Sequence, residues 1–263
     1  MTVTADDLAR IALQAGVLIM EIYESDFQIE HKDDKSPVTE ADQRAETLIL
    51  TELAKVEPDL KVIAEESVSD GHIPEHGSRF ALVDPVDGTR EFINKRGEFT
   101  VNIAIIEHGK PVMGVVFAPA LKRLFVAESP FEGWEADVAS GAPVPPDDAR
   151  KSLSIRKAPE AGLTAIASAS HRSDETNAFL DTQNVTNIIS AGSSLKFCLI
   201  AAGEADLYPR HGRTMEWDTA AGHAVAQAAG ARVSTLDGAL LTYGKTERGY
   251  DNPHFIVWGD CAP

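Results

Sequence analysis

Cysteine and long apolar runs are both scarce in this chain of 263 residues. The two cysteines, Cys198 and Cys261, are too few for a disulfide framework, so a reducing cytoplasm is the expected compartment. No apolar run has the length of a membrane-spanning helix, and the first residues lack the basic and apolar segments of a signal peptide. The sequence therefore predicts a cytoplasmic protein with no integral membrane segment.

Positive charge is also scarce, with 24 lysines and arginines against 41 aspartates and glutamates and a net charge of −17. Nucleic acids and anionic membrane surfaces bind to an excess of Lys and Arg, so we expect neither as a partner. A chain this acidic also repels small anions at long range. A phosphate-binding site would therefore need local cations, either metal ions or a few basic side chains.

Hydrophobic periodicity predicts an α/β protein with a mixed N-terminal half and a C-terminal half in which strands and helices alternate. In the N-terminal half we expect helices at 6–24 and 39–55, a strand or hairpin arm at 27–31, and strands at 61–64, 80–83, 100–107, 111–117 and 124–127. In the C-terminal half we expect strands at 164–167, 187–189, 205–208, 231–234 and 255–258, and helices at 173–182, 194–202 and 219–229. The Pro-rich stretch 140–148 favours a boundary near residue 155, which gives an α+β lobe at 1–155 and an α/β lobe at 156–263.

Asp84 and Asp87 follow the apolar run 80–83, which predicts a buried strand that ends at Asp84. Gly88 can adopt a positive φ, so Asp87 is expected in a turn just beyond the strand. Two carboxylates a few ångströms apart repel each other unless a cation lies between them, and divalent cations prefer oxygen ligands. Asp-Pro and Asp-Gly are also ordinary turn dipeptides, so this stretch alone leaves a metal site and a plain turn both open.

Three further acidic positions lie at the predicted ends of elements. Glu65 follows a strand directly, Asp218 stands at the start of a helix, and Asp42 lies three residues after Thr39. Each has a simpler explanation, with Glu65 and its neighbour Glu66 as solvated surface and the two aspartates as helix caps. Capping and metal ligation are compatible, because a carboxylate has several lone pairs to share.

A candidate anion site lies at 191–196, where a glycine and the hydroxyls of Ser193 and Ser194 enter a helix whose first turn carries Lys196. Free N–H groups and the helix dipole favour anions at such a start, although a plain helix cap uses the same residues. The loop at 208–213 adds two arginines and a histidine before the next helix. Acidic oxygen ligands, an anion-binding helix start and a basic loop are together what phosphoryl transfer to water requires.

Three stretches resemble, in the same order, the metal-binding motifs of the lithium-sensitive inositol monophosphatase superfamily. They are Glu65-Glu66-Ser67, Asp84-Pro85-Val86-Asp87-Gly88-Thr89 and Trp217-Asp218-Thr219-Ala220-Ala221-Gly222. Two more stretches, 87–102 and 192–198, resemble the bacterial 3′(2′),5′-bisphosphate nucleotidases of that superfamily. The resemblance covers essentially the whole chain, and it implies a five-layer αβαβα sandwich of the inositol monophosphatase and fructose-1,6-bisphosphatase type.

The resemblance implies an activity, namely Mg²⁺-dependent removal of the 3′-phosphate from adenosine 3′,5′-bisphosphate, and from its sulfated analogue, in sulfur assimilation. Two or three Mg²⁺ ions and inhibition by Li⁺ are expected, in a monomer or a homodimer. Peripheral association with the inner membrane, described for some relatives, stays open. The alternative within the same chemistry is an inositol or sugar monophosphatase, and the alternative from another class is a non-catalytic protein that binds a phosphorylated ligand.

One loop departs from the inositol phosphatases, which carry a glutamate that binds inositol hydroxyls before their Trp-Asp motif. The corresponding loop here reads Arg210-His211-Gly212-Arg213, which suits a second phosphate better than a sugar hydroxyl. Glu216 stands too close to Asp218 for that role.

The resemblance also assigns a set of metal ligands. Glu65, Asp84 and the carbonyl of Val86 would hold a first metal ion. Asp84, Asp87 and Asp218 would hold a second. Asp84 would therefore contact both ions.

Catalytic and substrate-binding residues follow in the same way. Glu65 and Thr89 would orient the attacking water, with Asp42 paired to Thr89 and near a third metal ion. The residues expected to contact the substrate are Val86, Asp87, Gly88, Thr89, His171, Ser193, Lys196, Arg210 and Asp218. Among these, the second phosphate would be bound by a serine, a lysine and an arginine, and the adenine would stack on the histidine.

Overall fold

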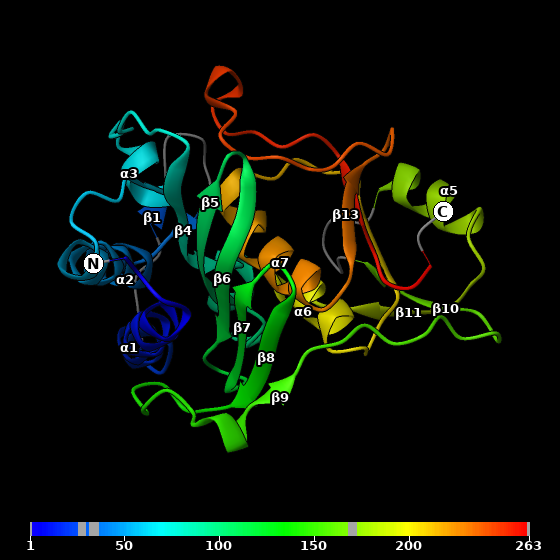
Figure 1. Ribbon diagram of the computed structural model, residues 1–263, viewed down its shortest axis with the longest axis horizontal. Helices are drawn as coiled ribbons and strands as arrows, with labels where there is room; N and C mark the ends of the chain where they lie inside the picture. The colour runs from blue at the N-terminus through cyan, green and yellow to red at the C-terminus, as the bar shows by residue number, and fades with distance from the viewer. Residues whose placement is uncertain (1, 26–29, 32–36, 168–172, 262–263) are drawn as a thin grey trace.

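The computed structural model describes residues 2–25, 30–31, 37–167 and 173–261, and these residues form five alternating layers of helices and strands (Figure 1). In order, the layers are the helices α1 (Ala5–Tyr23) and α2 (Glu40–Val56), a seven-stranded sheet, the helices α6 (Leu195–Ala201) and α7 (Glu216–Ala228), a five-stranded sheet, and the helix α5 (Asp174–Asp181). The predicted αβαβα sandwich is confirmed. No helix in the described ranges has the length and apolar composition needed to cross a membrane.

The seven-stranded sheet is antiparallel except where its first two strands pair. Its spatial order is β3 (Val62–Ala64), β4 (Arg79–Asp87), β5 (Thr100–Glu107), β6 (Lys110–Ala118), β7 (Arg123–Ser129), β8 (Glu132–Asp137) and β9 (Lys151–Ser152). The five-stranded sheet has the order β11 (Val185–Ser190), β10 (Leu163–Ala167), β12 (Leu207–Arg210), β14 (Phe255–Trp258) and β13 (Arg232–Thr235). The remaining elements are the strand pair β1 (Glu30–His31) and β2 (Pro37–Val38), the short helices α3 (Glu65–Ser69) and α4 (Thr89–Ile93), and the 3₁₀ helices η1 (Asp147–Ala149) and η2 (Thr246–Arg248).

Most predicted elements are confirmed within a few residues. The hairpin expected between 100 and 117 is formed by β5 and β6. The hairpin arm expected at 27–31 is described only at its last two residues, which form β1, and 27–29 lie outside the described residues. The two sheets lie on either side of residue 155, and the division of the chain into two lobes at that point stays a prediction.

The strand β4 differs from the prediction, because it does not end at Asp84 but continues to Asp87. Its pairing with β5 shifts register between these two residues. Pro85 has no N–H to donate to a neighbouring strand, and an irregularity in the ladder accommodates such a residue. Both aspartates therefore stand on one bulged strand.

Two boundaries in the C-terminal half also differ from the prediction. The helix expected from residue 219 begins at Glu216, so Asp218 lies in its first turn, where its carboxylate accepts the N–H of Met215 at 2.8 Å. This is the position from which an acidic residue caps a helix in the capping box. The strand β12 extends to Arg210, which was expected in the following loop.

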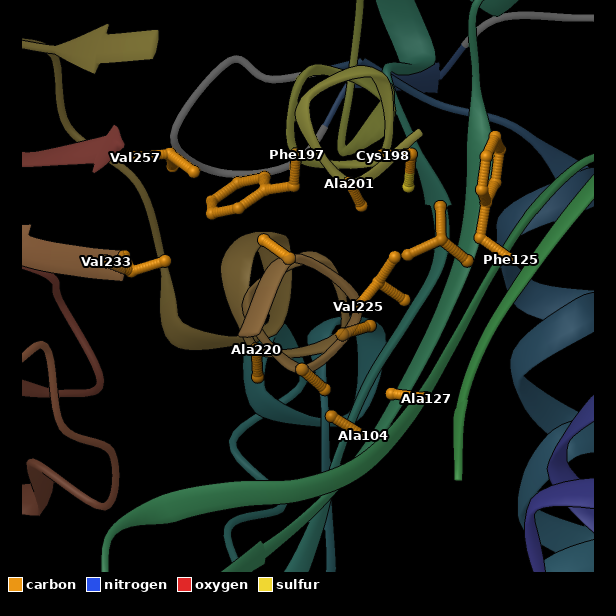
Figure 2. Close-up of a cluster of buried hydrophobic side chains, with 14 of the residues drawn as sticks. Ala104, Phe125, Ala127, Phe197, Cys198, Ala201, Ala220, Val225, Val233 and Val257 are labelled. Atoms are coloured by element: carbon orange, nitrogen blue, oxygen red, sulfur yellow. The ribbon is translucent and has the colours of Figure 1, made fainter. Parts of the chain in front are cut away.

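One large apolar cluster fixes the central helices between the two sheets (Figure 2). Figure 2 labels Phe197, Cys198 and Ala201 of α6, Ala220 and Val225 of α7, Ala104, Phe125 and Ala127 of the seven-stranded sheet, and Val233 and Val257 of the five-stranded sheet. The buried side chains of α7 are mostly small, so both sheets and α6 approach it closely. This packing brings the first residues of α6 and α7 together, where Ser194 Oγ donates to the carbonyl of Asp218 at 2.7 Å.

The outer helices complete the layers. An apolar cluster packs α1 and α2 against the other face of the seven-stranded sheet, and a smaller one packs α5 against the five-stranded sheet. The capping box predicted for α2 is confirmed, since Thr39 and Asp42 bind each other's backbone or side chain at the helix start. The start of α2 lies near the bulge of β4, since the charge of Asp42 acts on Asp84.

His223, on α7, is expected to make the protein less stable in acid. It is buried with Nδ1 3.0 Å from the hydroxyl of Tyr243, and burial lowers its pKa from 6.5 to about 3. Below pH 6.5 the unfolded chain therefore takes up a proton that the folded chain does not, so stability that is complete above this pH is lost as the pH falls. When the pH falls from 7 to 5, the free energy of unfolding should decrease by about 2 kcal/mol less in His223→Gln than in the wild type, as measured by urea unfolding at each pH. The same pH dependence in both proteins would show that His223 is protonated in the folded state.

Candidate active site

Three carboxylates meet where the chain leaves the strands β3 and β4. Glu65, Asp84 and Asp218 offer oxygen atoms that all lie within 4.8 Å of one another. Glu65 is the first residue of α3, directly after β3, while Asp84 lies on β4 and Asp218 on the first turn of α7. Because β3 and β4 are parallel, their carboxyl ends lie at the same end of the sheet, where the start of α7 meets them. The structure thus brings together three of the acids that the sequence predicts as ligands.

The electrostatics of this cluster favour a bound cation. Burial raises the pKa of Asp84 well above its ordinary value, and the charges of Glu65, Asp87 and other nearby acids raise it further. Burial also raises the pKa of Asp218, and the charges of Asp87 and Glu65 raise it further. The hydrogen bond from the N–H of Met215 acts in the opposite direction and lowers it. A divalent cation between the carboxylates would remove this repulsion, and a donor set made only of oxygen suits Mg²⁺. The residues present therefore fit a divalent metal centre.

Two local hydrogen bonds hold the irregular end of β4, which follows Asp84. The N–H of Val86 donates to Asp84 Oδ1 at 3.0 Å, and Thr89 Oγ1 donates to the carbonyl of Val86 at 3.3 Å. Gly88 has a φ of +91°, and a Cβ there would lie 3.2 Å from the carbonyl oxygen of Glu98. Only glycine meets both requirements without strain, so the positive φ predicted at Gly88 is confirmed, whereas Asp87, expected in a turn, lies on β4.

Asp87 is held in place by hydrogen bonds from the loop before α6. Ser193 Oγ and the N–H of Ser194 donate to Asp87 Oδ2 at 2.8 and 2.7 Å. Asn102 Nδ2 lies 3.3 Å from the same oxygen. The hydroxyl of Ser193, predicted to contact a phosphate, therefore binds a carboxylate of the acidic site in this structure.

Asn102, which was not predicted as a site residue, and Ser194, predicted as part of an anion-binding helix start, connect Asp87 to Asp218. Asn102 Nδ2 donates to Ser194 Oγ at 3.1 Å, and Ser194 Oγ donates to the carbonyl of Asp218. Both side chains are buried. The sequence carries one signal for this network, which is the polar pair Thr100 and Asn102 in a strand that is otherwise almost entirely apolar.

Two basic side chains, Lys196 and Arg210, lie near enough for their charges to act on the acidic cluster. Lys196 is only 6% exposed, and burial lowers its pKa to about 8 while the charge of Asp87 opposes this shift. The charge of Arg210 lowers the pKa of both Lys196 and Asp218. The structure therefore gathers predicted cations beside predicted metal ligands, which is what an anionic ligand needs in a chain with a net charge of −17.

Asp42 lies beside the cluster at the start of α2. The N–H and Oγ1 of Thr39 each donate to its Oδ2 at 2.8 Å. Its charge raises the pKa of Asp84. The pairing of Asp42 with Thr89 stays a prediction, and His171, predicted against the adenine, lies outside the described residues.

Two more buried acids near these elements bind backbone groups. Glu216 accepts hydrogen bonds from the N–H groups of Gly244 and Lys245 at 2.7 and 2.9 Å, and pairs with Lys245 Nζ at 2.7 Å. It thereby fastens that loop to the start of α7. Glu46, which was not predicted to contribute, lies one turn after Asp42 on α2 and accepts hydrogen bonds from the first turn of α3. The sequence does carry a signal for Glu46, because this acidic residue lies on the apolar face of a predicted helix.

An αβαβα sandwich with a partly buried cluster of carboxylate oxygens where strands end and a helix begins, and with basic groups beside the cluster, has the features of a metal-dependent phosphatase. A family model described as the inositol monophosphatase family matches residues 2–255, and the chain belongs to this family.

Relatives from several bacteria are similar over nearly their full length. A protein of Salmonella typhimurium named 3′(2′),5′-bisphosphate nucleotidase CysQ is 43% identical over 96% of this chain and 98% of its own. The protein of the same name from Escherichia coli K12 is 42% identical over the same shares. The crystal structure of CysQ from Bacteroides thetaiotaomicron matches 98% of this chain and 97% of its own with a TM-score of 0.81 at 36% identity. The Thermotoga maritima IMPase matches 96% of this chain and 90% of its own with a TM-score of 0.73 at 26% identity.

Proposed function

We propose that this protein is a Mg²⁺-dependent 3′(2′),5′-bisphosphate nucleotidase, which hydrolyses adenosine 3′,5′-bisphosphate to AMP and inorganic phosphate. The observation that carries the proposal is the cluster of Glu65, Asp84 and Asp218, with oxygens within 4.8 Å of one another. Similarity to proteins named CysQ, at 42–43% identity over nearly the whole chain, supports the choice of substrate. The sulfated analogue is a second expected substrate, which would place the enzyme in sulfur assimilation. We also propose that the protein is cytoplasmic and is a monomer or a homodimer. Peripheral attachment to the inner membrane is compatible with this proposal.

The proposed metal centre uses both halves of the chain. Glu65, Asp84 and the carbonyl of Val86 are the ligands proposed for one Mg²⁺. Asp84, Asp87 and Asp218 are those proposed for a second, and a third near Asp42 belongs to the same proposal. When bound, Mg²⁺ would lower the pKa of the attacking water and neutralise charge on the leaving oxygen. The mutual repulsion of these carboxylates, which is strongest at the buried Asp84, supports this assignment, because only a cation relieves it without protonation.

Hydrolysis needs a water molecule in line with the phosphorus–oxygen bond that breaks. As the water oxygen bonds to phosphorus, the bond to the ribose 3′-oxygen breaks, and a proton ends on that oxygen to give the free hydroxyl. Glu65 and Thr89 are proposed to orient the water. The hydrogen bond from Thr89 Oγ1 to the carbonyl of Val86 supports this role, because it ties the hydroxyl to the strand β4, which carries Asp84. Asp42 is proposed to hold Thr89 in place.

The second phosphate is proposed to bind at Lys196, Arg210 and Ser193, with His171 against the adenine. The charges of Lys196 and Arg210 support this assignment, since both act on groups of the acidic site. Ser193 Oγ would need to share its contact with Asp87 or exchange it for the phosphate.

Lys196→Ala should raise the KM for the bisphosphate about 10- to 150-fold, because a charge-assisted hydrogen bond of about 1.5–3 kcal/mol is lost. The KM for adenosine 3′-monophosphate, which lacks the second phosphate, should change much less. Steady-state kinetics on both substrates with the same enzyme preparation provide the comparison. Equal increases in the two KM values would remove Lys196 from the second-phosphate site.

The function itself is tested by phosphate release from adenosine 3′,5′-bisphosphate, its sulfated analogue, adenosine 3′-monophosphate and inositol 1-phosphate. We expect the bisphosphate to be hydrolysed with the highest kcat/KM, only with Mg²⁺ present, and with inhibition by EDTA and by Li⁺. A clear preference for inositol 1-phosphate would assign an inositol phosphatase instead. Failure to release phosphate from every compound would favour a non-catalytic protein that binds a phosphorylated ligand.

A further inference from the structure

The short helix α3 begins at Glu65, and its cap is supplied by another helix. Its own N-cap residue, Ala64, has no side chain that can accept a hydrogen bond. The first N–H groups of a helix have no partner within the helix, so they need an external acceptor. Glu46 of α2 is that acceptor, with Oε2 2.8 Å from the N–H of Glu66 and Oε1 2.8 Å from the N–H of Ser67. Ser67 Oγ also donates to Glu46 Oε1 at 2.6 Å.

This arrangement confines the residue that begins the helix. With both carboxylate oxygens of Glu46 bonded to the two residues after Glu65, the backbone at Glu65 is fixed relative to α2. The helix α3 has only five residues, so it supplies few internal hydrogen bonds of its own to hold this position. Glu46 is itself fixed, because it is 4% exposed on the buried face of α2, one turn after Asp42.

The burial of Glu46 costs stability, and that cost points to a specific role. Burial raises the pKa of Glu46, the three hydrogen bonds lower it, and the charge of Glu65 raises it again. An apolar residue on the same helix face would avoid this cost but would leave the N–H groups of α3 without the acceptor. A glutamine would keep the shape of the side chain, but its amide NH₂ cannot accept a hydrogen bond. At least one of the three hydrogen bonds that Glu46 accepts from α3 would therefore be lost.

We propose that Glu46 is a positioning residue for the metal centre, which holds Glu65 at the distance from Asp84 and Asp218 that a divalent cation requires. The proposal rests on the proposed role of Glu65 as a metal ligand. Partners that orient a ligand are commonly worth about 10- to 100-fold in metal affinity or activity, and the contact with α3 gives Glu46 that place.

The test compares Glu46→Gln with Glu52→Gln in the full-length protein. Glu52 lies on the same helix, but it pairs with Arg10 and Lys55 at the surface, so it controls for the loss of one negative charge on α2. Mn²⁺ binding is measured by titration calorimetry without substrate, and the Mg²⁺-induced rise in Tm is measured in parallel. We expect Glu46→Gln to weaken Mn²⁺ binding about 10- to 100-fold and to reduce the rise in Tm, while Glu52→Gln matches the wild type.

Ser67→Ala provides a milder variant in case Glu46→Gln does not fold. It removes one of the three hydrogen bonds to Glu46, and we expect a smaller loss of Mn²⁺ affinity in the same direction. At saturating Mg²⁺, the KM for the bisphosphate should be the same in all the variants. Mn²⁺ affinities equal to that of the wild type in Glu46→Gln, or in Ser67→Ala if only that variant folds, would overturn the proposal. A wild type that binds Mn²⁺ but does not hydrolyse the bisphosphate would instead count against the proposed function alone.

Discussion

Asp84→Asn is expected to abolish turnover and, without divalent cations, to make the protein more stable. Asp84 is 1% exposed, and burial together with the surrounding acids raises its pKa. Asparagine keeps the oxygen that accepts the N–H of Val86 but carries no charge, so the repulsion within the cluster decreases. The same loss of charge removes the proposed ligand shared by both metal ions, and we expect kcat to fall at least about 1000-fold.

The two effects give a crossing pattern that a purely structural role for Asp84 would not produce. In EDTA, the Tm of Asp84→Asn should exceed that of the wild type by at least about 2–4 °C, which corresponds to about 1 kcal/mol in a protein of this size. In saturating Mg²⁺ the order should reverse, because only the wild type gains binding free energy in the folded state. Asp148→Asn, an exposed change on the surface, serves as the control and should alter neither Tm nor kcat. A variant with a tenth of the wild-type kcat would contradict the proposed role of Asp84.

Hydrophobic periodicity predicted most of the elements, the family resemblance implied their layers, and the exceptions show which information was missing. Apolar periodicity identified the strands around Asp84 but placed the end of β4 at that residue, because Asp-Pro reads as a turn. The strand continues through a register shift, which depends on pairing with β5 and not on residue type. The helix α7 begins earlier than predicted for a similar reason, since Asp218 caps it from inside the first turn.

The acids of the site were predictable because each follows an apolar run or begins an element. The residues that hold them were not, since their partners are distant in sequence. Asn102 reaches Ser194 across 92 positions, and Glu46 reaches Glu66 across 20. The local sequence pattern does not indicate which distant residues come into contact, so these contacts can be identified only in the assembled fold.

The contact between α6 and α7 depends on Gly222, and Gly222→Val is expected to be among the most damaging changes outside the acidic cluster. A Cβ at this position would lie 2.7 Å from Cγ and Cδ2 of Phe197 and 2.9 Å from its Cβ. The last of these atoms is next to the backbone of α6, so a rotation of the ring cannot relieve the clash. The two helices would have to move apart, although both are packed between the two sheets (Figure 2).

Two opposing effects decide the size of this change. Valine favours the helix over glycine by a few tenths of a kcal/mol, whereas overpacking a buried contact costs about 1–3 kcal/mol and occasionally more. Overpacking therefore prevails, and because valine adds two methyl groups beyond Cβ, we expect a loss of about 3 kcal/mol, or about 6–12 °C in Tm. Since α6 carries Lys196 and α7 carries Asp218, their separation should also raise the KM for the bisphosphate.

A second substitution distinguishes this clash from a general loss of helix stability. Phe197→Ala removes Cγ and Cδ2, the two atoms closest to the new Cβ, and alone should cost about 3–5 kcal/mol because it leaves a cavity in the core. In the double variant Gly222→Val/Phe197→Ala the valine can enter the space that the ring leaves, so the combined loss should be smaller than the sum of the single losses by at least about 1 kcal/mol. Urea unfolding of the four proteins measures this coupling directly. Additive losses would mean that the valine does not clash with the ring of Phe197, and that the loss at Gly222 arises from other contacts of α7.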